Sequence, residues 1–180
     1  TDTIESMGYS IIMATIDGRR GVRNMLEARG IPVQHCQFHQ LMTITQCLTK
    51  RPRLPQNIEL RAIALTLSRT DELSFENALA DWYSKHGKWL KERDTVTKRY
   101  AHERTRRAYF SLVRNLPNLF TYQHDYMQEY SIETGKKIAN TTSPLDCRFG
   151  VWKDKLIPHR GASKQLTFTM LCSFFSRTTD

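Results

Sequence analysis

The chain has 180 residues, enough for one domain or one domain with an insertion, and 39% of them are hydrophobic, enough for a core. Its net charge of +9 favours an anionic partner, most often nucleic acid, with an ordinary basic protein as the alternative. The four cysteines match neither a zinc ribbon nor a dense disulfide framework. With no signal-peptide pattern and no apolar run of about 20 residues, we expect a cytoplasmic protein with free thiols.

The first 49 residues alternate between strand and helix patterns. Residues 10–16 are apolar and β-branched, which predicts a strand that ends in a tight turn. Residues 20–28 have helical spacing, with Gly30 as the stop signal. A second strand is expected at 31–34 and a second helix at 37–48. This order predicts an α/β layer with a parallel pair of strands.

The pattern changes at the basic, proline-punctuated linker 50–55 and is helical from there to Leu116. The expected helices are 58–68, 73–90 and a long one at 92–116, which Pro117 ends. We therefore predict an all-helical insertion at 50–117, between sheet-containing parts at 1–49 and 118–180. The fold class expected is α/β with a helical insertion.

The last 63 positions are expected to begin with a short strand at 119–122 and an irregular segment at 125–138. That segment contains a turn at Thr134-Gly135. Two helices follow, at 144–156 and 163–175, and a loop separates them.

Asp17 is the first candidate for chemistry because it directly follows the first predicted strand. An acidic residue at the carboxyl end of a strand faces the crevice where open α/β sheets bind ligands. Asp17-Gly18 is also a good turn sequence, and the strand pattern alone does not decide between the two interpretations.

Asp146 is the second candidate, in the segment Asn140-Thr141-Thr142-Ser143-Pro144-Leu145-Asp146. Ser143 and Pro144 suit the start of a helix, which places Asp146 in its first turn. There it is either a metal-holding acid or a residue that complements the helix dipole. Lys153 stands seven residues later, on the same helical face, where a lysine can hold a phosphate or simply be solvated.

Cys36 and His39 stand one helical turn apart, but no second pair at finger spacing completes a closed zinc site. We expect the two residues to have a structural role at the start of the helix near Asp17, and metal binding is the less favoured alternative.

Residues 85–114 contain ten Lys and Arg residues against three Asp and Glu. Six aromatic residues, at 82, 83, 89, 100, 109 and 110, are interleaved with them. Such a surface is typical of proteins that follow a phosphate backbone and stack on bases, although many of these rings must also build a helical core. Arg99, Arg106 and Arg107 are the residues expected to face DNA.

Taken together, two blocks resemble the Mutator-related bacterial insertion-sequence transposases. The first is Ile16-Asp17-Gly18-Arg19-Arg20-Gly21-Val22 followed by Ile31-Pro32-Val33-Gln34-His35-Cys36-Gln37-Phe38-His39, similar to the family's second-aspartate block. The second is the segment that ends in Asp146, followed by Phe149, Lys153 and His159-Arg160-Gly161-Ala162-Ser163-Lys164, similar to its last catalytic block. The helical middle matches the family in kind rather than in motif.

The resemblance implies an RNase H-like fold with three metal-binding acids and a helical insertion between the second and the third. Asp17 would be the second acid and Asp146 the third, holding two Mg²⁺ or Mn²⁺ ions for DNA cleavage and strand transfer. Lys153, with His159 and Arg160, would contact DNA, and Cys36 and His39 would form the structural motif. The partners implied are transposon-end and target DNA and further copies of the protein.

Three departures from the family's pattern qualify the resemblance. The third acid is Asp rather than Glu, and Ser143 replaces an Asn. The first acid is expected upstream of Thr1, so we expect this fragment alone to be inactive. The alternatives are another RNase H-like nuclease or resolvase, a non-catalytic decayed or domesticated DNA-binding protein, and a basic helical protein with no nucleic-acid role.

Overall fold

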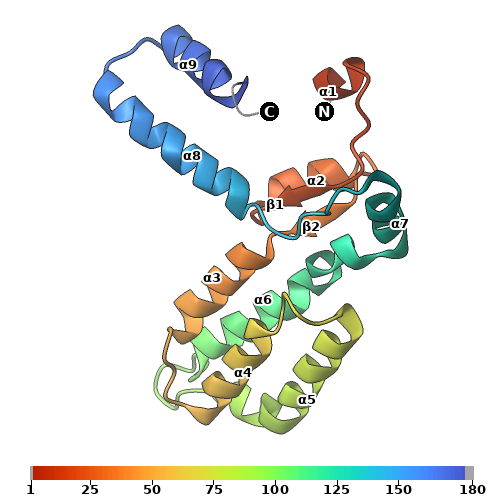
Figure 1. Ribbon diagram of the computed structural model, residues 1–180. Coiled ribbons are helices and arrows are strands. Elements are labelled where there is room, and N and C mark those ends of the chain that lie inside the picture. Colours follow the sequence, from red (N-terminus) through yellow and green to blue (C-terminus); the bar gives the residue numbers. More distant parts are fainter. Residues whose placement is uncertain (1, 177–180) are drawn as a thin grey trace. The chain divides into compact units, whose positions relative to one another are not determined.

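The computed structural model describes residues 2–176, and the chain divides into one unit that ends at Thr141 and another that begins at Thr142. The first unit contains α1 (Asp2–Ser6), β1 (Ala14–Ile16), α2 (Arg20–Glu27), β2 (Val33–His35), α3 (Gln37–Leu48), α4 (Pro55–Leu65), α5 (Glu72–Leu90), α6 (Glu103–Leu119), the 3-10 turn Thr121–Gln123 and α7 (Asp125–Thr134) (Figure 1). The second contains α8 (Ser143–Leu156), the 3-10 turn Ile157–His159 and α9 (Lys164–Ser176). The protein is therefore mostly helical.

The two strands are parallel and are joined by α2, as the sequence predicts. Ala14 pairs with Val33 and Ile16 with His35. Leu26, Ile31 and Val33 form a small core that partly buried apolar side chains of the first strand segment cover. The β1 strand has three residues rather than the seven predicted, because residues 10–13 have no strand partner among the described residues. The mixed α/β class is confirmed at this level.

The largest core lies among α3, α4, α5 and α6. Phe75, Leu60, Leu112 and Phe120 are fully buried there, and Ile44 joins them from α3. Helix α3 therefore packs with the helical segment that follows it, although the sequence grouped this helix with the strands.

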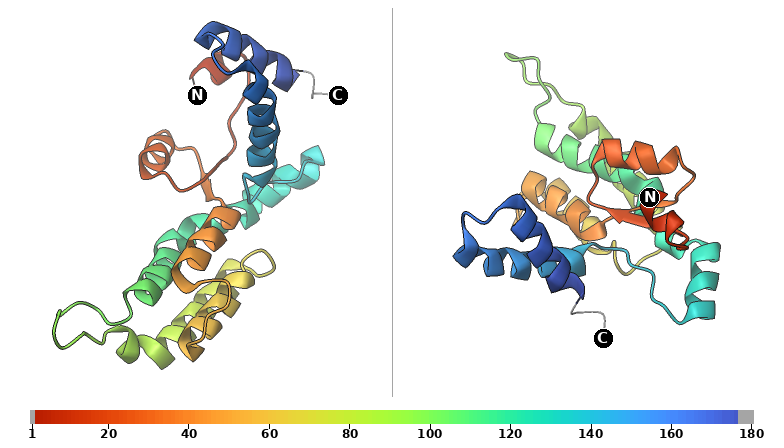
Figure 2. Two further views of the ribbon diagram at one scale, coloured as in Figure 1. Left: turned by 90° about the vertical axis from the view of Figure 1, so that its left-hand side faces the viewer. Right: turned by 90° about the horizontal axis from the view of Figure 1, so that it is seen from above.

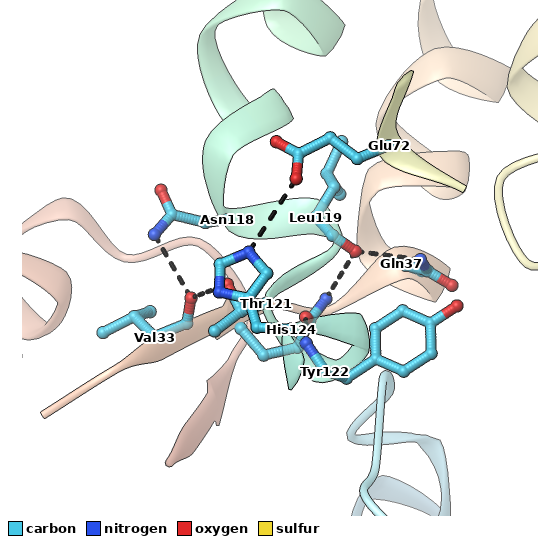
Figure 3. Close-up of polar contacts among 9 residues, drawn as sticks. Val33, Gln37, Glu72, Asn118, Leu119, Thr121, Tyr122 and His124 are labelled. Carbon is cyan, nitrogen blue, oxygen red and sulfur yellow. Dashed lines mark hydrogen bonds and ion pairs between the residues drawn. The ribbon is translucent and has the colours of Figure 1, made fainter. Parts of the chain in front are cut away.

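Polar contacts join the second strand to the end of the helical block (Figure 3). Gln34 and Gln37 both donate side-chain hydrogen bonds of 2.9 Å to the carbonyl of Leu119. The carbonyl of Val33 accepts from the Thr121 hydroxyl at 2.8 Å. All these groups are buried, so each unpaired partner would be costly and the contacts fix β2 against α6.

The predicted long helix at 92–116 is wrong, because residues 91–102 form a loop that projects from the helical block (Figure 2). The Asp94 carboxylate accepts hydrogen bonds from the backbone N–H groups of Val96 and Thr97. This local turn competes with helix formation, and β-branched residues favour it further. Lys98 adopts a positive φ of 58°, which closes the turn.

The chain between 117 and 138 also differs from prediction. Helix α6 continues through Pro117 to Leu119, since the buried side chains of Leu119 and Phe120 extend the helical core past it. The strand expected at 119–122 is instead the end of α6 and a 3-10 turn. The segment expected to be irregular contains α7, and Gly135 in the left-handed conformation ends it.

In the second unit both expected helices are confirmed, with ends shifted by one residue. None of the described residues of α8 is buried. Phe149 and Trp152 make an edge-to-face contact at 6.5 Å, and Lys155 lies over the ring of Phe174. Within residues 2–176, no helix combines the length and apolarity that a membrane crossing requires.

Candidate functional site

Asp17 directly follows β1 at the carboxyl edge of the strand pair. Its carboxylate is 46% exposed and lies 3.7 Å from the guanidinium Nε of Arg19. The backbone N–H of Arg19 donates to the same carboxylate at 3.4 Å. These contacts are long, so they leave the carboxylate oxygens accessible to a further ligand.

Gly18 occupies a position that admits no side chain. Its φ of +97° lies in the region that L residues rarely adopt. A Cβ added there would overlap with Cε1 of His35, the last residue of β2. The turn after Asp17 therefore lies directly against the His35 ring, which fixes where the Asp17 backbone runs.

The His35 ring is almost fully buried, with 5% of the residue exposed. Its Nδ1 lies 3.1 Å from an N–H group of Arg23, so it accepts from that guanidinium when the ring is neutral. Burial, followed by the positive charge of Arg23, lowers the pKa of His35 from 6.5 to about 4. At neutral pH this ring is uncharged and compensates no charge around it.

This shift predicts acid sensitivity. Between pH 6.5 and 4 the unfolded chain carries a proton on His35 that the folded chain does not, so the free energy of unfolding falls as the pH drops through this range. The loss reaches about 3 kcal/mol by pH 4. Urea unfolding at a series of pH values measures this slope. The variant His35→Gln, whatever its absolute stability, is expected to have a flatter profile, and an unchanged slope would contradict the assignment.

A segment far along the chain lies against the carboxyl ends of both strands. The Thr15 hydroxyl donates to the carbonyl of Ala139 at 2.9 Å. The backbone N–H of Gln37 donates to the carbonyl of Asn140 at 3.0 Å, and the Asn140 amide returns a bond to the Gln37 side chain. Residues 139–140 are thus held at the edge where Asp17 leaves β1.

Cys36 and His39 lie together in the first turn of α3, with 3.2 Å between Sγ and Nδ1. Cys36 is fully buried, and its Sγ lies 3.4 Å from the Thr141 hydroxyl. Its backbone N–H donates to the carbonyl of Ile16, the residue before Asp17. This arrangement ties the start of α3 to β1 and to residue 141.

Asp146 lies in the second unit, in the first turn of α8. Its carboxylate accepts a hydrogen bond of 2.9 Å from the hydroxyl of Thr142, the N-cap residue. Helix α8 begins at Ser143, which the sequence placed as the cap. Asp146 and Lys153 are both exposed on α8, as are His159 and Arg160 beyond its end.

The basic stretch is divided between the projecting loop and α6. Arg99 and Arg107 are exposed, and Arg106 stacks on the rings of Tyr100 and Phe110 at 3.9 and 4.6 Å. Most of the other interleaved rings fill space inside the protein, because Trp82 and Tyr109 are buried and stack on each other. A neighbouring hollow of about 520 Å³ is lined by three further arginines, at 51, 53 and 104.

One arginine group escaped the sequence analysis. A hollow of about 490 Å³ separates α2 from the end of α6 and is lined by Gly18, Arg20, Arg23, Glu27, Arg114 and Asn115. We call it the α2–α6 hollow. Helical spacing does place residues 20, 23 and 27 on one face of α2, but nothing in the sequence predicts that this face meets residue 114.

No cluster of three or more metal-binding side chains of the His, Cys, Asp and Glu types occurs within residues 2–176. Comparisons with known proteins found that no family model, no curated protein and no solved structure matches the chain.

Proposed function

We propose that the chain is part of the catalytic region of a DNA transposase with an RNase H-like fold, of the Mutator-related bacterial type that its motifs resemble. In this proposal Asp17 is the second catalytic acid, Asp146 is the third, and the first precedes Thr1. The protein acts in the bacterial cytoplasm on transposon-end and target DNA, as a dimer or higher oligomer.

The observation that carries the proposal is the position of residues 139–141. They are held at the carboxyl ends of β1 and β2 by contacts with Thr15, Gln37 and Cys36. This edge is where ligands bind in open α/β sheets, and Asp17 lies on it. The block that contains Asp146 thus begins at the Asp17 edge, although more than 100 residues separate the two blocks in sequence.

The carboxylates fit a hard divalent cation. Oxygen ligands are those that Mg²⁺ and Mn²⁺ prefer, and the Asp17 oxygens have only long contacts with Arg19. When bound, the two ions supply Lewis acidity for phosphodiester cleavage and joining. Asp17 and Asp146 hold the cations, while neutral His35 and Gly18 keep the turn after β1 in place.

The basic surface supports DNA as the substrate. Arg99 and Arg107 are exposed, and the stack on Tyr100 and Phe110 presents Arg106 in a fixed position. Arginines held in this way lose little conformational entropy when they bind phosphates. In the second unit Lys153 follows Asp146 by two helical turns, where it contacts the phosphates of the DNA end.

The experiment is a strand-transfer assay with the full-length protein, labelled transposon-end duplexes and a supercoiled target. Joined products are expected with Mg²⁺ or Mn²⁺, and none with EDTA or with Ca²⁺ alone. DNA binding that is never accompanied by cleavage or joining under any of these conditions would instead indicate a non-catalytic DNA-binding protein. Cleavage without joining would indicate a nuclease.

A further inference from the structure

The α2–α6 hollow has a positive charge that the protein does not neutralise. Arg20, Arg23 and Arg114 line it, and Glu27 is the one acidic residue of its lining. Within the part of the chain that the structure describes, none of the three guanidinium groups forms an ion pair with a carboxylate. A concentration of positive charge in a concave, polar site attracts an anion.

Arg23 is the most informative of the three. One of its terminal nitrogens donates to the Asn115 side chain at 3.2 Å and to His35 at 3.1 Å. Both partners are neutral, because the lowered pKa of His35 leaves its ring unprotonated. The Nε of Arg23 is buried and has no hydrogen-bond partner. A half-buried guanidinium with neutral partners and an unused donor is a group whose charge an anion would compensate.

The contacts of Arg23 also hold its guanidinium in place. Asn115 belongs to α6 and His35 to β2, so the arginine of α2 is held from two other elements. Arg20 and Arg114 are exposed at the rim, on opposite sides of the hollow. A fixed arginine with two mobile ones around it suits the several oxygens of a phosphate group, to which guanidinium groups donate in pairs.

We propose that the α2–α6 hollow binds a backbone phosphate of DNA. The inference rests on the proposed function for its choice of a nucleic acid as the source of the phosphate. Gly18 lines the hollow and directly follows Asp17, so a strand whose phosphate occupies it passes next to the catalytic edge. The hollow thereby positions DNA for the acids without taking part in the chemistry.

The test measures DNA affinity in EDTA, where no cleavage occurs. The full-length protein and the variants Arg20→Gln and Arg114→Gln are titrated into a labelled duplex at several salt concentrations. Each rim arginine is exposed, so folding is expected to be retained, and thermal unfolding checks this. Each variant is expected to bind more weakly and to lower the slope of log K against log salt by about 0.9, the value for one lost phosphate contact. Arg69→Gln removes the same charge from an exposed site outside the hollow and is expected to leave the slope unchanged.

Slopes for Arg20→Gln and Arg114→Gln equal to that of Arg69→Gln would overturn the proposal. A second arm adds inorganic phosphate alone and follows thermal unfolding. Stabilisation that the two rim variants abolish, together with unchanged DNA slopes, would identify a site for free phosphate and would also overturn the assignment to DNA. Because binding is measured in EDTA, lost slopes with no strand transfer by the wild type would refute the proposed function while leaving this site intact. Normal strand transfer with unchanged slopes would do the reverse.

Discussion

Replacing Asp17 or Asp146 with alanine in the full-length protein is expected to abolish strand transfer, with a loss of about a thousandfold or more. Removing one carboxylate that holds the catalytic cations forfeits several kcal/mol of stabilisation of the transition state. Binding to transposon ends in EDTA is expected to survive, since neither carboxylate donates to a phosphate. The two readouts are the yield of joined product with Mg²⁺ and the affinity for end duplexes.

Matched controls separate this effect from a loss of charge or of fold. Asp154→Asn removes an exposed carboxylate from the same helix as Asp146, and Asp81→Asn removes one from α5. Both are expected to retain strand transfer. Asp146→Glu keeps the carboxylate and restores the residue type usual in the family that the motifs resemble, so activity is expected to persist. Mg²⁺-dependent joining by either alanine variant would refute the assignment of that residue.

Gly18→Ala is expected to destabilise the protein by about 4 kcal/mol. One contribution is the positive φ of +97°, which is strained for any residue with a Cβ. The other is the overlap of that Cβ with the buried ring of His35, which cannot move without breaking its contact with Arg23. Urea unfolding gives the free energy, and a loss below about 1 kcal/mol would show that the turn is not held against His35.

Two other glycines separate these contributions. Gly30→Ala has the positive φ of +70° but no atom within 4 Å of the new Cβ, so a loss of about 1–2 kcal/mol is expected from backbone strain alone. Gly21→Ala lies in the helix α2 with open space around it and is expected to stabilise by about 0.5–1 kcal/mol. In the double variant Gly18→Ala/His35→Ala, the overlap is relieved, so the two losses are expected to add to less than their sum.

The elements near Asp17 were predictable because local signals agree there. The apolar β-branched run before Asp17 gives β1, Gly30 follows α2, and α3 matches its expected bounds, Gln37–Leu48. Parallel pairing follows from the helix between the strands. The contacts of Cys36 and His39 are also local, one helical turn apart.

The misses arose where tertiary contacts or a local turn decided the structure. Pro117 normally marks a helix end, but Leu119 and Phe120 belong to the helical core, and the helix continues to them. The turn around Asp94 broke a helix that the surrounding charged residues favoured. The α2–α6 hollow depends on contacts between Arg23 and Asn115, residues 92 positions apart, which no periodicity reveals.

The claim that Asp17 and Asp146 hold the same catalytic cations is tested most directly by Fe²⁺-mediated cleavage of the polypeptide. In the full-length protein, Fe²⁺ replaces Mg²⁺, and ascorbate with peroxide generates radicals that cut the backbone near the bound ion. The account predicts cuts around both residue 17 and residue 146, suppressed by excess Mg²⁺. It further predicts that Asp17→Ala removes the cut at residue 146 as well as its own. Cuts around only one of the two aspartates, or a cut at residue 146 that persists in Asp17→Ala, would contradict it.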